Sequence, residues 1–238
     1  MPLFQGQRCG VTGASGSLGR ALLLALHRQG ATPVALSHSP GPLRLQDGEH
    51  EFEIETIHWQ VGAEEALEPE LQSLQLLVIN HGINRMKSRD AKATAESLEV
   101  NLSSALRLME FFLAVAKPGD GRELWVNTSE AEIQPAVSPV YEISKRLLGQ
   151  LVSLRGATRD PNERNQLIIR KLVLGPFRSD LNPIGIMNAN WVANQVLNQA
   201  SWGLRLIIVT PNPLTYLLMP ITELGRRAYS QILNHPGP

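Results

Sequence analysis

The fold of this chain is indicated first by the stretch Arg8-Cys-Gly-Val-Thr-Gly-Ala-Ser-Gly-Ser-Leu-Gly19, in which an apolar run leads into three spaced glycines. Leu22, Leu23 and Leu26 follow at the spacing of one helical face. A strand, a glycine-rich turn and a helix are therefore expected in immediate succession. That succession is the first half of a βαβ unit, which predicts an α/β fold with a parallel sheet.

The remainder of the chain repeats this alternation. We expect further strands over residues 32–37, 52–61, 76–80, 123–128, 167–174 and 206–210, and helices over 18–29, 95–116, 138–155 and 221–233. Segments 39–42 and 47–51 are rich in turn-forming or acidic residues and are predicted to be loops. Seven parallel strands joined by right-handed crossover helices make a Rossmann-type doubly wound sheet with helices on both faces, a three-layer αβα sandwich.

Length and composition limit the classes of protein to consider. At 238 residues the chain is expected to form one domain over 1–238, with a frayed tail over 233–238. The 22 basic and 22 acidic residues cancel, so no nucleic-acid partner is expected. Cys9 is the only cysteine, which excludes an internal disulfide, and the histidines are scattered, so no metal site is predicted. The N-terminus lacks the pattern of a signal peptide, and we expect a cytoplasmic protein.

The glycine-rich turn has the chemistry of a dinucleotide site. Its glycines let the backbone turn tightly and approach a pyrophosphate. The helix that follows offers free N–H donors and a partial positive charge to the same group. The candidate residues for contact with the dinucleotide are Thr12, Gly13, Ser15, Gly16, Ser17, Leu18 and Gly19.

The end of the second strand bears on the choice of nicotinamide cofactor. Sites specific for NAD place an acidic residue there, which holds the ribose hydroxyls. This chain has Ser37, His38 and Ser39 instead. Hydroxyls and an imidazole accept a 2′-phosphate that a carboxylate would repel, so we predict NADP(H) as the preferred cofactor and NAD(H) as the other candidate. Arg20 and Arg44 are further candidates for positive charge near that phosphate.

A tyrosine and a lysine four residues apart supply the candidate chemistry. On a helix, Tyr141 and Lys145 share one face with their Cβ atoms about 5–6 Å apart. An ammonium beside a phenol favours the phenolate, so the pKa of Tyr141 is expected to fall below its usual value of about 10. Such a phenol donates a proton to a carbonyl oxygen or takes one from an alcohol.

Together these motifs resemble the short-chain dehydrogenase/reductase family over nearly the whole chain. The resemblance implies an oxidoreductase that transfers hydride between a nicotinamide and a carbonyl or alcohol, with an Asn–Ser–Tyr–Lys tetrad. Tyr141 and Lys145 match the tyrosine and lysine of that tetrad and are implied to contact the cofactor as well. Asn101 matches the asparagine, which holds a proton-relay water. The serine falls on Thr128, which keeps the hydroxyl, with Ser129 as the neighbouring alternative.

The same resemblance implies further cofactor contacts. The segment after the fourth strand is similar to the family's Asn-Asn-Ala-Gly, with His81 as a departure, and its Asn80 is expected to be structural. Backbone atoms and one hydroxyl after the sixth strand are implied to pass the nicotinamide. The residues implied are Gln60, Val61, Asn80, His81, Gly82, Pro176, Phe177 and Ser179.

The sequence also indicates where a substrate and a second subunit would bind. We expect the substrate pocket at the carboxyl ends of the strands, between segments 130–140 and 177–191. Both segments are mostly apolar, which favours a neutral, partly hydrophobic carbonyl or alcohol. The apolar segment 214–220 is expected to form a subunit contact of a homodimer or homotetramer rather than a membrane contact.

Two other interpretations stay open. The glycine spacing is typical of sugar-nucleotide epimerases and dehydratases on the same fold, so an epimerase-like enzyme is the first alternative. A non-catalytic dinucleotide sensor is the second. The intact tyrosine and lysine favour an enzyme, because a protein that only binds the nucleotide does not need them.

Overall fold

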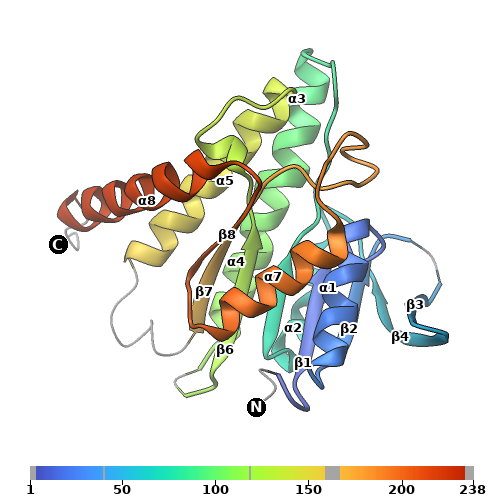
Figure 1. Ribbon diagram of the computed structural model, residues 1–238. Coiled ribbons are helices and arrows are strands. Elements are labelled where there is room, and N and C mark those ends of the chain that lie inside the picture. The colour runs from blue at the N-terminus through green and yellow to red at the C-terminus, as the bar shows by residue number, and fades with distance from the viewer. Residues whose placement is uncertain (1–3, 40, 118, 159–166, 234–238) are drawn as a thin grey trace.

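The computed structural model describes residues 4–39, 41–117, 119–158 and 167–233. Its centre is an eight-stranded sheet with the order β3-β4-β2-β1-β5-β6-β7-β8 (Figure 1). The strands are β1 (Arg8–Thr12), β2 (Thr32–Ser37), β3 (Leu43–Asp47), β4 (His50–His58), β5 (Leu76–Ile79), β6 (Arg122–Asn127), β7 (Leu167–Leu174) and β8 (Leu206–Val209). Neighbouring strands are parallel except β3 with β4. The Rossmann-type doubly wound fold is therefore confirmed.

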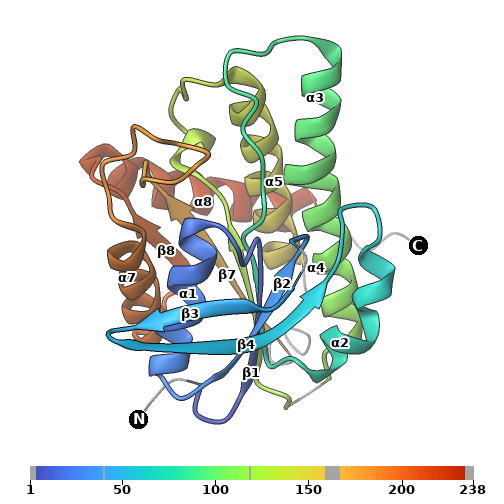
Figure 2. The same ribbon diagram turned by 90° about the vertical axis from the view of Figure 1, so that its right-hand side faces the viewer.

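Helices cover both faces of the sheet (Figure 2). They are α1 (Ser17–Arg28), α2 (Glu68–Ser73), α3 (Ala91–Leu98), α4 (Ser104–Val115), α5 (Pro139–Thr158), α7 (Ala189–Ser201) and α8 (Pro213–Leu233). Short 3-10 or π-helical turns are η1 (Glu64–Leu67), η2 (Glu99–Ser103) and η3 (Glu130–Glu132). Buried side chains of α1 and α7 pack on one face, and those of α2, α4 and α5 on the other. The three-layer arrangement follows.

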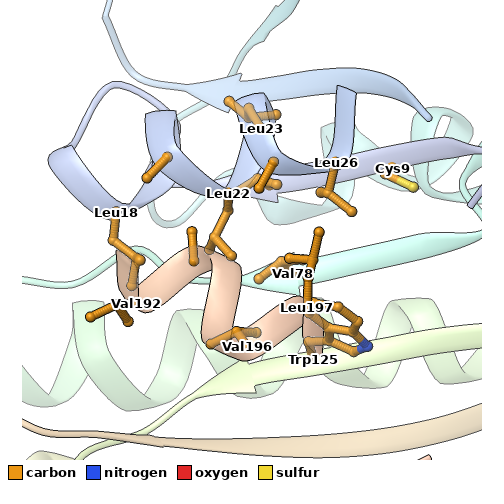
Figure 3. Packing of buried hydrophobic residues seen from close by; sticks show 14 of the residues in the cluster. Cys9, Leu18, Leu22, Leu23, Leu26, Val78, Trp125, Val192, Val196 and Leu197 are labelled. Carbon is orange, nitrogen blue, oxygen red and sulfur yellow. The ribbon is translucent and has the colours of Figure 1, made fainter. Parts of the chain in front are cut away.

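The core of the first face joins α1 to α7 (Figure 3). Leu22 and Leu26 of the predicted apolar stripe are fully buried, and so are Val192 and Val196 of α7. Burial of each such side chain contributes about 2 kcal/mol before the loss of conformational entropy is counted. This packing holds the start of α1, where the glycine-rich turn ends, in a defined place above the sheet.

One strand of the sheet was not predicted. β3 runs antiparallel to β4 at the sheet edge. The expected seven parallel strands are therefore wrong in two respects, because the sheet has eight strands and one of them is antiparallel. The two strands meet in a tight hairpin at Gly48, whose φ is +61°. An Asp-Gly pair between alternating residues is a hairpin signal. The acidic composition of residues 47–51 favours a loop, which is why the sequence does not predict this hairpin.

Two C-terminal helices also differ from expectation. α7 was not predicted, and its start is capped by Asn188, whose Oδ1 accepts from the backbone N–H of Asn190 at 2.8 Å. α8 begins at Pro213 rather than at residue 221, because proline suits a first helical turn. Pro220 then lies inside the helix. Past Leu233 the predicted frayed tail lies outside the described residues.

Candidate active site

The predicted tyrosine and lysine lie in the first two turns of α5. Lys145 Nζ is 5.8 Å from the centroid of the Tyr141 ring. It donates a hydrogen bond of 3.0 Å to the carbonyl oxygen of Asn127, the last residue of β6. The end of the strand therefore holds the buried lysine beside the tyrosine, on the helical face that their spacing predicted.

The hydroxyl that faces the tyrosine belongs to Ser129. Its side chain is hydrogen-bonded to the Tyr141 side chain. Ser129 Oγ also accepts from the backbone N–H of Ala131 at 3.2 Å, which caps η3 and orients the serine. Thr128 points elsewhere, because its Oγ1 donates to the carbonyl oxygen of Leu172 on β7 at 3.1 Å. The placement favours the alternative of the sequence prediction, Ser129, over Thr128.

Burial changes the proton affinity of both groups. The pKa of Tyr141 is raised above its usual value because burial disfavours the phenolate, and the hydrogen bond with Ser129 opposes this only in part. The pKa of Lys145 is lowered to about 8 because burial disfavours the ammonium, while the Glu132 carboxylate acts in the opposite direction. The expected lowering of the Tyr141 pKa is therefore wrong in this structure, since burial is the larger influence and the hydrogen bond with Ser129 does not offset it.

Asn101 lies in the π-helical turn η2, between α3 and α4. Its Oδ1 accepts from the backbone N–H of Ile83 at 2.7 Å, and its Nδ2 donates to the carbonyl oxygen of the same residue at 2.9 Å. The amide thus clamps the chain just after β5. A Cβ at Gly82 would lie 2.9 Å from Asn101 Oδ1, so this clamp requires glycine there. Single π-turns inside helices are frequent at functional sites.

A pair of buried serines connects this clamp to the tyrosine. Asn101 Nδ2 also lies 3.1 Å from Ser97 Oγ and 3.0 Å from Ser144 Oγ. Ser144 Oγ in turn donates to the carbonyl oxygen of Tyr141 at 2.7 Å. Ser97 was not singled out in the sequence, although its spacing of four residues from Asn101 places both on one helical face. The network fixes the first turn of α5 against η2.

The glycine-rich turn has the form that a dinucleotide requires. Gly13 has a φ of +61°, and a Cβ there would lie 2.9 Å from His81 Cα. A Cβ at Gly19 would overlap the carbonyl oxygen of Gly13. Gly16 is the N-cap of α1, and no side chain caps that helix or brings an acidic group into its first turn. Free backbone N–H groups at a helix N-terminus are suited to bind a pyrophosphate.

Thr12 ties this turn to the segment after β5. Its Oγ1 accepts from the backbone N–H of Asn80 at 2.8 Å and of His81 at 3.2 Å. The imidazole of His81 lies between Thr12 Oγ1 at 2.9 Å and Ser104 Oγ at 3.1 Å. Burial lowers the pKa of His81 to about 4, so the ring is neutral at ordinary pH. The histidine that departs from the family pattern therefore serves as a link beneath the turn.

The predicted adenosine-side residues lie at the carboxyl ends of β2 and β4. Ser37 is buried, and its Oγ accepts from the backbone N–H of Ser39 at 3.1 Å, whereas His38, Gln60 and Val61 are exposed. No carboxylate stands at the end of β2. The charge of Arg44 is shared with two glutamates, Glu51 at 3.7 Å and Glu53 at 3.6 Å.

The segment after β7 closes a cleft beside the turn. The cleft has a volume of about 730 Å³ and lies between α1, β3 and residues 178–190, with Ser17 and Ser179 both in its lining. Pro176 and Phe177 are held by the return of the loop, since the backbone N–H of Ile186 donates to the carbonyl oxygen of Pro176 at 3.0 Å. Predicted cofactor residues from both ends of the chain thus meet at one cleft.

One buried acceptor beside the lysine has no hydrogen-bond partner in the part of the chain that the structure describes. It is Oδ1 of Asn127, whose Nδ2 donates to Asn80 Oδ1 at 2.8 Å. A buried acceptor without a partner is costly, so a ligand group that donates is favoured at this point. With the glycine turn, it indicates that these residues fit a nicotinamide dinucleotide.

The fold has many solved relatives. A short-chain dehydrogenase from Burkholderia cenocepacia in complex with NADP is 20% identical, with a TM-score of 0.74 over 98% of this chain and 99% of that one. A short-chain dehydrogenase from Sphingobium yanoikuyae with NADPH is 13% identical, with a TM-score of 0.73 over 98% of each chain. One from Leptospira borgpetersenii with bound NAD+ has a TM-score of 0.70 at 16% identity, over 87% of this chain and 92% of that one.

A curated relative is much more similar in sequence. It is a monoglucosyldiacylglycerol epimerase from Synechocystis, 46% identical over 223 residues, which are 92% of this chain and 53% of the relative. The chain thus spans about half the length of that protein. Residues 8–182 also match the short chain dehydrogenase family. With the glycine turn and the Tyr141–Lys145 pair in place, the chain belongs to the short-chain dehydrogenase/reductase family of NAD(P)-dependent oxidoreductases.

Proposed function

We propose that this chain is an NAD(P)-dependent epimerase that inverts one hydroxyl-bearing carbon of a glucosyl lipid. The observation that carries the proposal is the Tyr141 hydroxyl, paired with Ser129 and backed by Lys145, at the carboxyl end of β6. The relative named as a monoglucosyldiacylglycerol epimerase supports the choice of substrate. Inversion of a sugar carbon can pass through a transient ketone, and a site of this kind is suited to interconvert an alcohol and a ketone.

Each residue of the site would have a distinct role in this reaction. Tyr141 takes the proton of a sugar hydroxyl while the C–H bond at the same carbon breaks, which leaves a ketone. Ser129 donates a hydrogen bond to the ketone oxygen. Lys145 holds the ribose, and Asn101 keeps the surrounding backbone in place.

The bound nicotinamide supplies the hydride acceptor and donor. Inversion requires the ketone to turn over in the site, so that its opposite face receives hydrogen while Tyr141 returns its proton to the oxygen. The alcohol that leaves is the epimer of the one that entered, so substrate and nucleotide undergo no net oxidation or reduction.

The test uses the glycolipid itself. The chain is incubated with monoglucosyldiacylglycerol in detergent and a trace of oxidised nucleotide, and the sugar is analysed by NMR. We expect an epimeric sugar without lasting change in nucleotide absorbance, and Tyr141→Phe should lose at least about 100-fold in rate. Wild-type turnover in Tyr141→Phe would sink the assignment.

A net reductase is the second candidate. The raised pKa of Tyr141 favours this alternative, because a protonated phenol is the form that donates to a carbonyl. Val137, Ile184 and Ile186 have exposed apolar side chains and belong to the two segments that are expected to border the substrate pocket. A reductase would oxidise one nucleotide for each ketone reduced. Stoichiometric loss of NADPH with simple ketones, and no epimerisation of the lipid, would favour this function.

NADP(H) is the cofactor that we propose. His38 is exposed at the end of β2 and Ser39 adjoins it, where a 2′-phosphate would meet no carboxylate. His38→Asp should weaken NADP(H) binding about tenfold, or about 1.4 kcal/mol, by repulsion. NAD(H) binding should be unchanged or tighter. Calorimetric titration of both nucleotides gives the ratio, and an unchanged ratio would place the 2′-phosphate elsewhere.

A further inference from the structure

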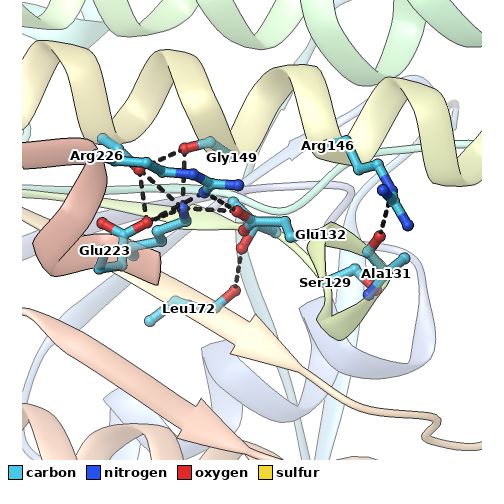
Figure 4. Close-up of polar contacts among 11 residues, drawn as sticks. Ser129, Ala131, Glu132, Arg146, Gly149, Leu172, Glu223 and Arg226 are labelled. Carbon is cyan, nitrogen blue, oxygen red and sulfur yellow. Dashed lines mark hydrogen bonds and ion pairs between the residues drawn. The ribbon is translucent and has the colours of Figure 1, made fainter. Parts of the chain in front are cut away.

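α8 turns several of its polar side chains toward the protein. Glu223 is buried, and its Oε1 accepts from Lys171 Nζ of β7 at 2.6 Å and from Ser153 Oγ of α5 at 2.6 Å (Figure 4). One turn on, Arg226 Nη1 lies 2.6 Å from an oxygen of Glu132. A surface helix normally buries its apolar face and exposes its charges. In α8, by contrast, the charged side chains of Glu223 and Arg226 lie on the side of the helix that faces the protein.

The buried charges hold the helix in this orientation. Lys171 Nζ also lies 2.7 Å from Glu132 Oε2, so two lysine or arginine groups meet two carboxylates with little solvent. Removing one member of such a cluster leaves an uncompensated buried charge, which is strongly destabilising. Rotation of α8 about its axis would break every one of these contacts. The outward face therefore cannot turn into the core.

Large apolar side chains are spread over the exposed side of α8, from its first turn to its last. Its exposed large side chains follow helical spacing and are between 41% and 71% exposed: Leu214, Leu217, Leu218, Ile221, Leu224 and Ile232. We call this surface the α8 outer face. A contiguous apolar surface of this kind marks an interaction site. The only acidic residue of α8 is the buried Glu223, whereas Arg227 is exposed.

We propose that the α8 outer face lies on the surface of a lipid bilayer that contains anionic lipids. The choice of occupant rests on the proposed function, because a diacylglycerol substrate stays in the membrane and its enzyme must reach it there. The polarity of the helix fits this occupant. Apolar side chains enter the headgroup boundary by about 5–10 Å, and basic residues beside them attract anionic headgroups.

In this proposal α8 lies in the plane of the membrane surface and does not cross the bilayer. In the described residues, no helix is long and apolar enough for a span. An in-plane helix needs only one apolar side, which α8 has. In Figure 1, α8 extends outward from the sheet past α5. The large exposed fractions of its apolar side chains show that the described part of the chain leaves the α8 outer face uncovered.

The first turn of α8 is tied to the loop that carries Ser129. Thr215 Oγ1 accepts from Gln134 Nε2 at 2.7 Å, and Thr210 Oγ1 donates to Glu130 Oε2 at 2.5 Å. Because neighbouring strands are about 4.8 Å apart, the ends of β6 and β8 are separated by about 10 Å. A membrane under α8 therefore lies beside the carboxyl edge of the sheet, where the headgroup sugar has to reach Tyr141.

Flotation on a density gradient tests the contact without any assay of catalysis. The 238-residue chain is mixed with vesicles of phosphatidylcholine alone or with phosphatidylglycerol added. We expect the protein to float with the vesicles, more strongly when phosphatidylglycerol is present. The triple variant Leu217→Gln, Ile221→Gln, Leu224→Gln should lower the bound fraction at least about tenfold. Arg227→Gln should remove only the preference for phosphatidylglycerol.

The matched control changes apolar side chains of similar exposure elsewhere. Trp202→Gln with Leu204→Gln alters side chains that are 70% and 42% exposed between α7 and β8. This variant should float like the unchanged chain. Circular dichroism must show equal helix content in all variants. The proposal is overturned if the unchanged chain stays in the aqueous fraction with both vesicles, or if the triple variant floats equally well.

Two further outcomes separate the possible failures. If the unchanged chain does not float and is a dimer that the triple variant converts to a monomer, the α8 outer face is a contact between two copies. Turnover of a short-chain, water-soluble glucosyl lipid measures the proposed function independently. If the chain floats but does not epimerise the lipid, the membrane contact is supported and the epimerase function is rejected. If it epimerises the lipid but does not float, the function is supported and the membrane contact is rejected.

Discussion

The carboxylate of Glu132 occupies the space that a side chain at Gly149 would need. A Cβ on Gly149 would overlap the carboxyl group, so the glycine opens a hole in α5 that the glutamate fills. Gly149 lies one turn after Lys145 on the same helical face. The negative charge is therefore placed along α5 next to the lysine of the site, and it opposes the effect of burial on the pKa of Lys145.

Gly149→Ala should destabilise the protein although alanine favours helices. The new methyl displaces the Glu132 carboxylate from Lys171 and Arg226, and breaking a buried ionic contact costs about 3 kcal/mol. Gly156→Ala is the control in the same helix, because a Cβ there meets nothing within 4 Å. It should stabilise by about 0.5–1 kcal/mol. Urea unfolding of both variants measures the difference, and equal midpoints would contradict the packing of Glu132.

Ser129→Ala and Thr128→Val separate the two candidate hydroxyls. Loss of the Ser129 hydroxyl should lower kcat by about 100-fold, because it removes the donor beside Tyr141. Thr128→Val removes a hydrogen bond to Leu172 and should cost about 1 kcal/mol of stability with little loss of kcat. Steady-state kinetics and thermal unfolding give both quantities. The opposite pattern would restore Thr128 to the site.

Nucleotide binding should weaken as pH rises through about 8. The pKa of Lys145 is lowered to about 8 by burial, so the ammonium that would hold the ribose is present below this pH and lost above it. Titration of the nucleotide from pH 6.5 to 9.5, values chosen to span roughly that pKa, should give a Kd that rises on the alkaline side. Lys145→Arg keeps its charge and should show no such rise. A flat profile in the unchanged chain would mean that the lysine charge does not act on the nucleotide.

Glu64 should make the protein sensitive to acid. Burial raises the pKa of its carboxyl, but hydrogen bonds from Arg107 at 2.7 Å and Ser104 at 2.6 Å outweigh this and lower it to about 2. The folded pKa lies below the unfolded one, so the stabilisation is present above about pH 4.5 and is lost toward about pH 2.

The matching variant is Glu64→Gln. It should lower the stability at neutral pH by about 2 kcal/mol, because a buried hydrogen-bonded charge is removed from its partners. The difference from the unchanged chain should shrink as the pH falls. Denaturant unfolding at several pH values measures it. A difference that stays constant with pH would show that the carboxylate is not the source of the stabilisation.

Local patterns were sufficient for the elements that carry the site. The bounds of β1, β2 and β7 agree with the predicted ranges, because each is a short run of apolar residues between polar or glycine-rich turns. The lysine and tyrosine were found because helical spacing alone puts them on one face. The sequence predicts β4 as a strand but not β3, because the polar and charged residues around the hairpin turn resemble a loop.

Contacts between distant segments decide which hydroxyl faces Tyr141 and in which direction the pKa of that tyrosine shifts. Thr128 and Ser129 are adjacent, and in extended backbone neighbouring side chains point to opposite sides, so their spacing from Tyr141 could not separate them. Which one faces the tyrosine depends on η3 and on β7. The raised pKa of Tyr141 likewise arises from burial by segments distant in sequence, which outweighs the hydrogen bond with Ser129.

Local sequence is enough to predict the alternation of strands and helices, the glycine turn and the position of the tyrosine and lysine, because each depends on neighbours within a few residues. The polarity of α8 was decided in three dimensions. Lys171 and Glu132 come from β7 and η3, and only their meeting with Glu223 makes the charged side of the helix the buried one. Long-range electrostatic pairing therefore set which side of α8 faces outward.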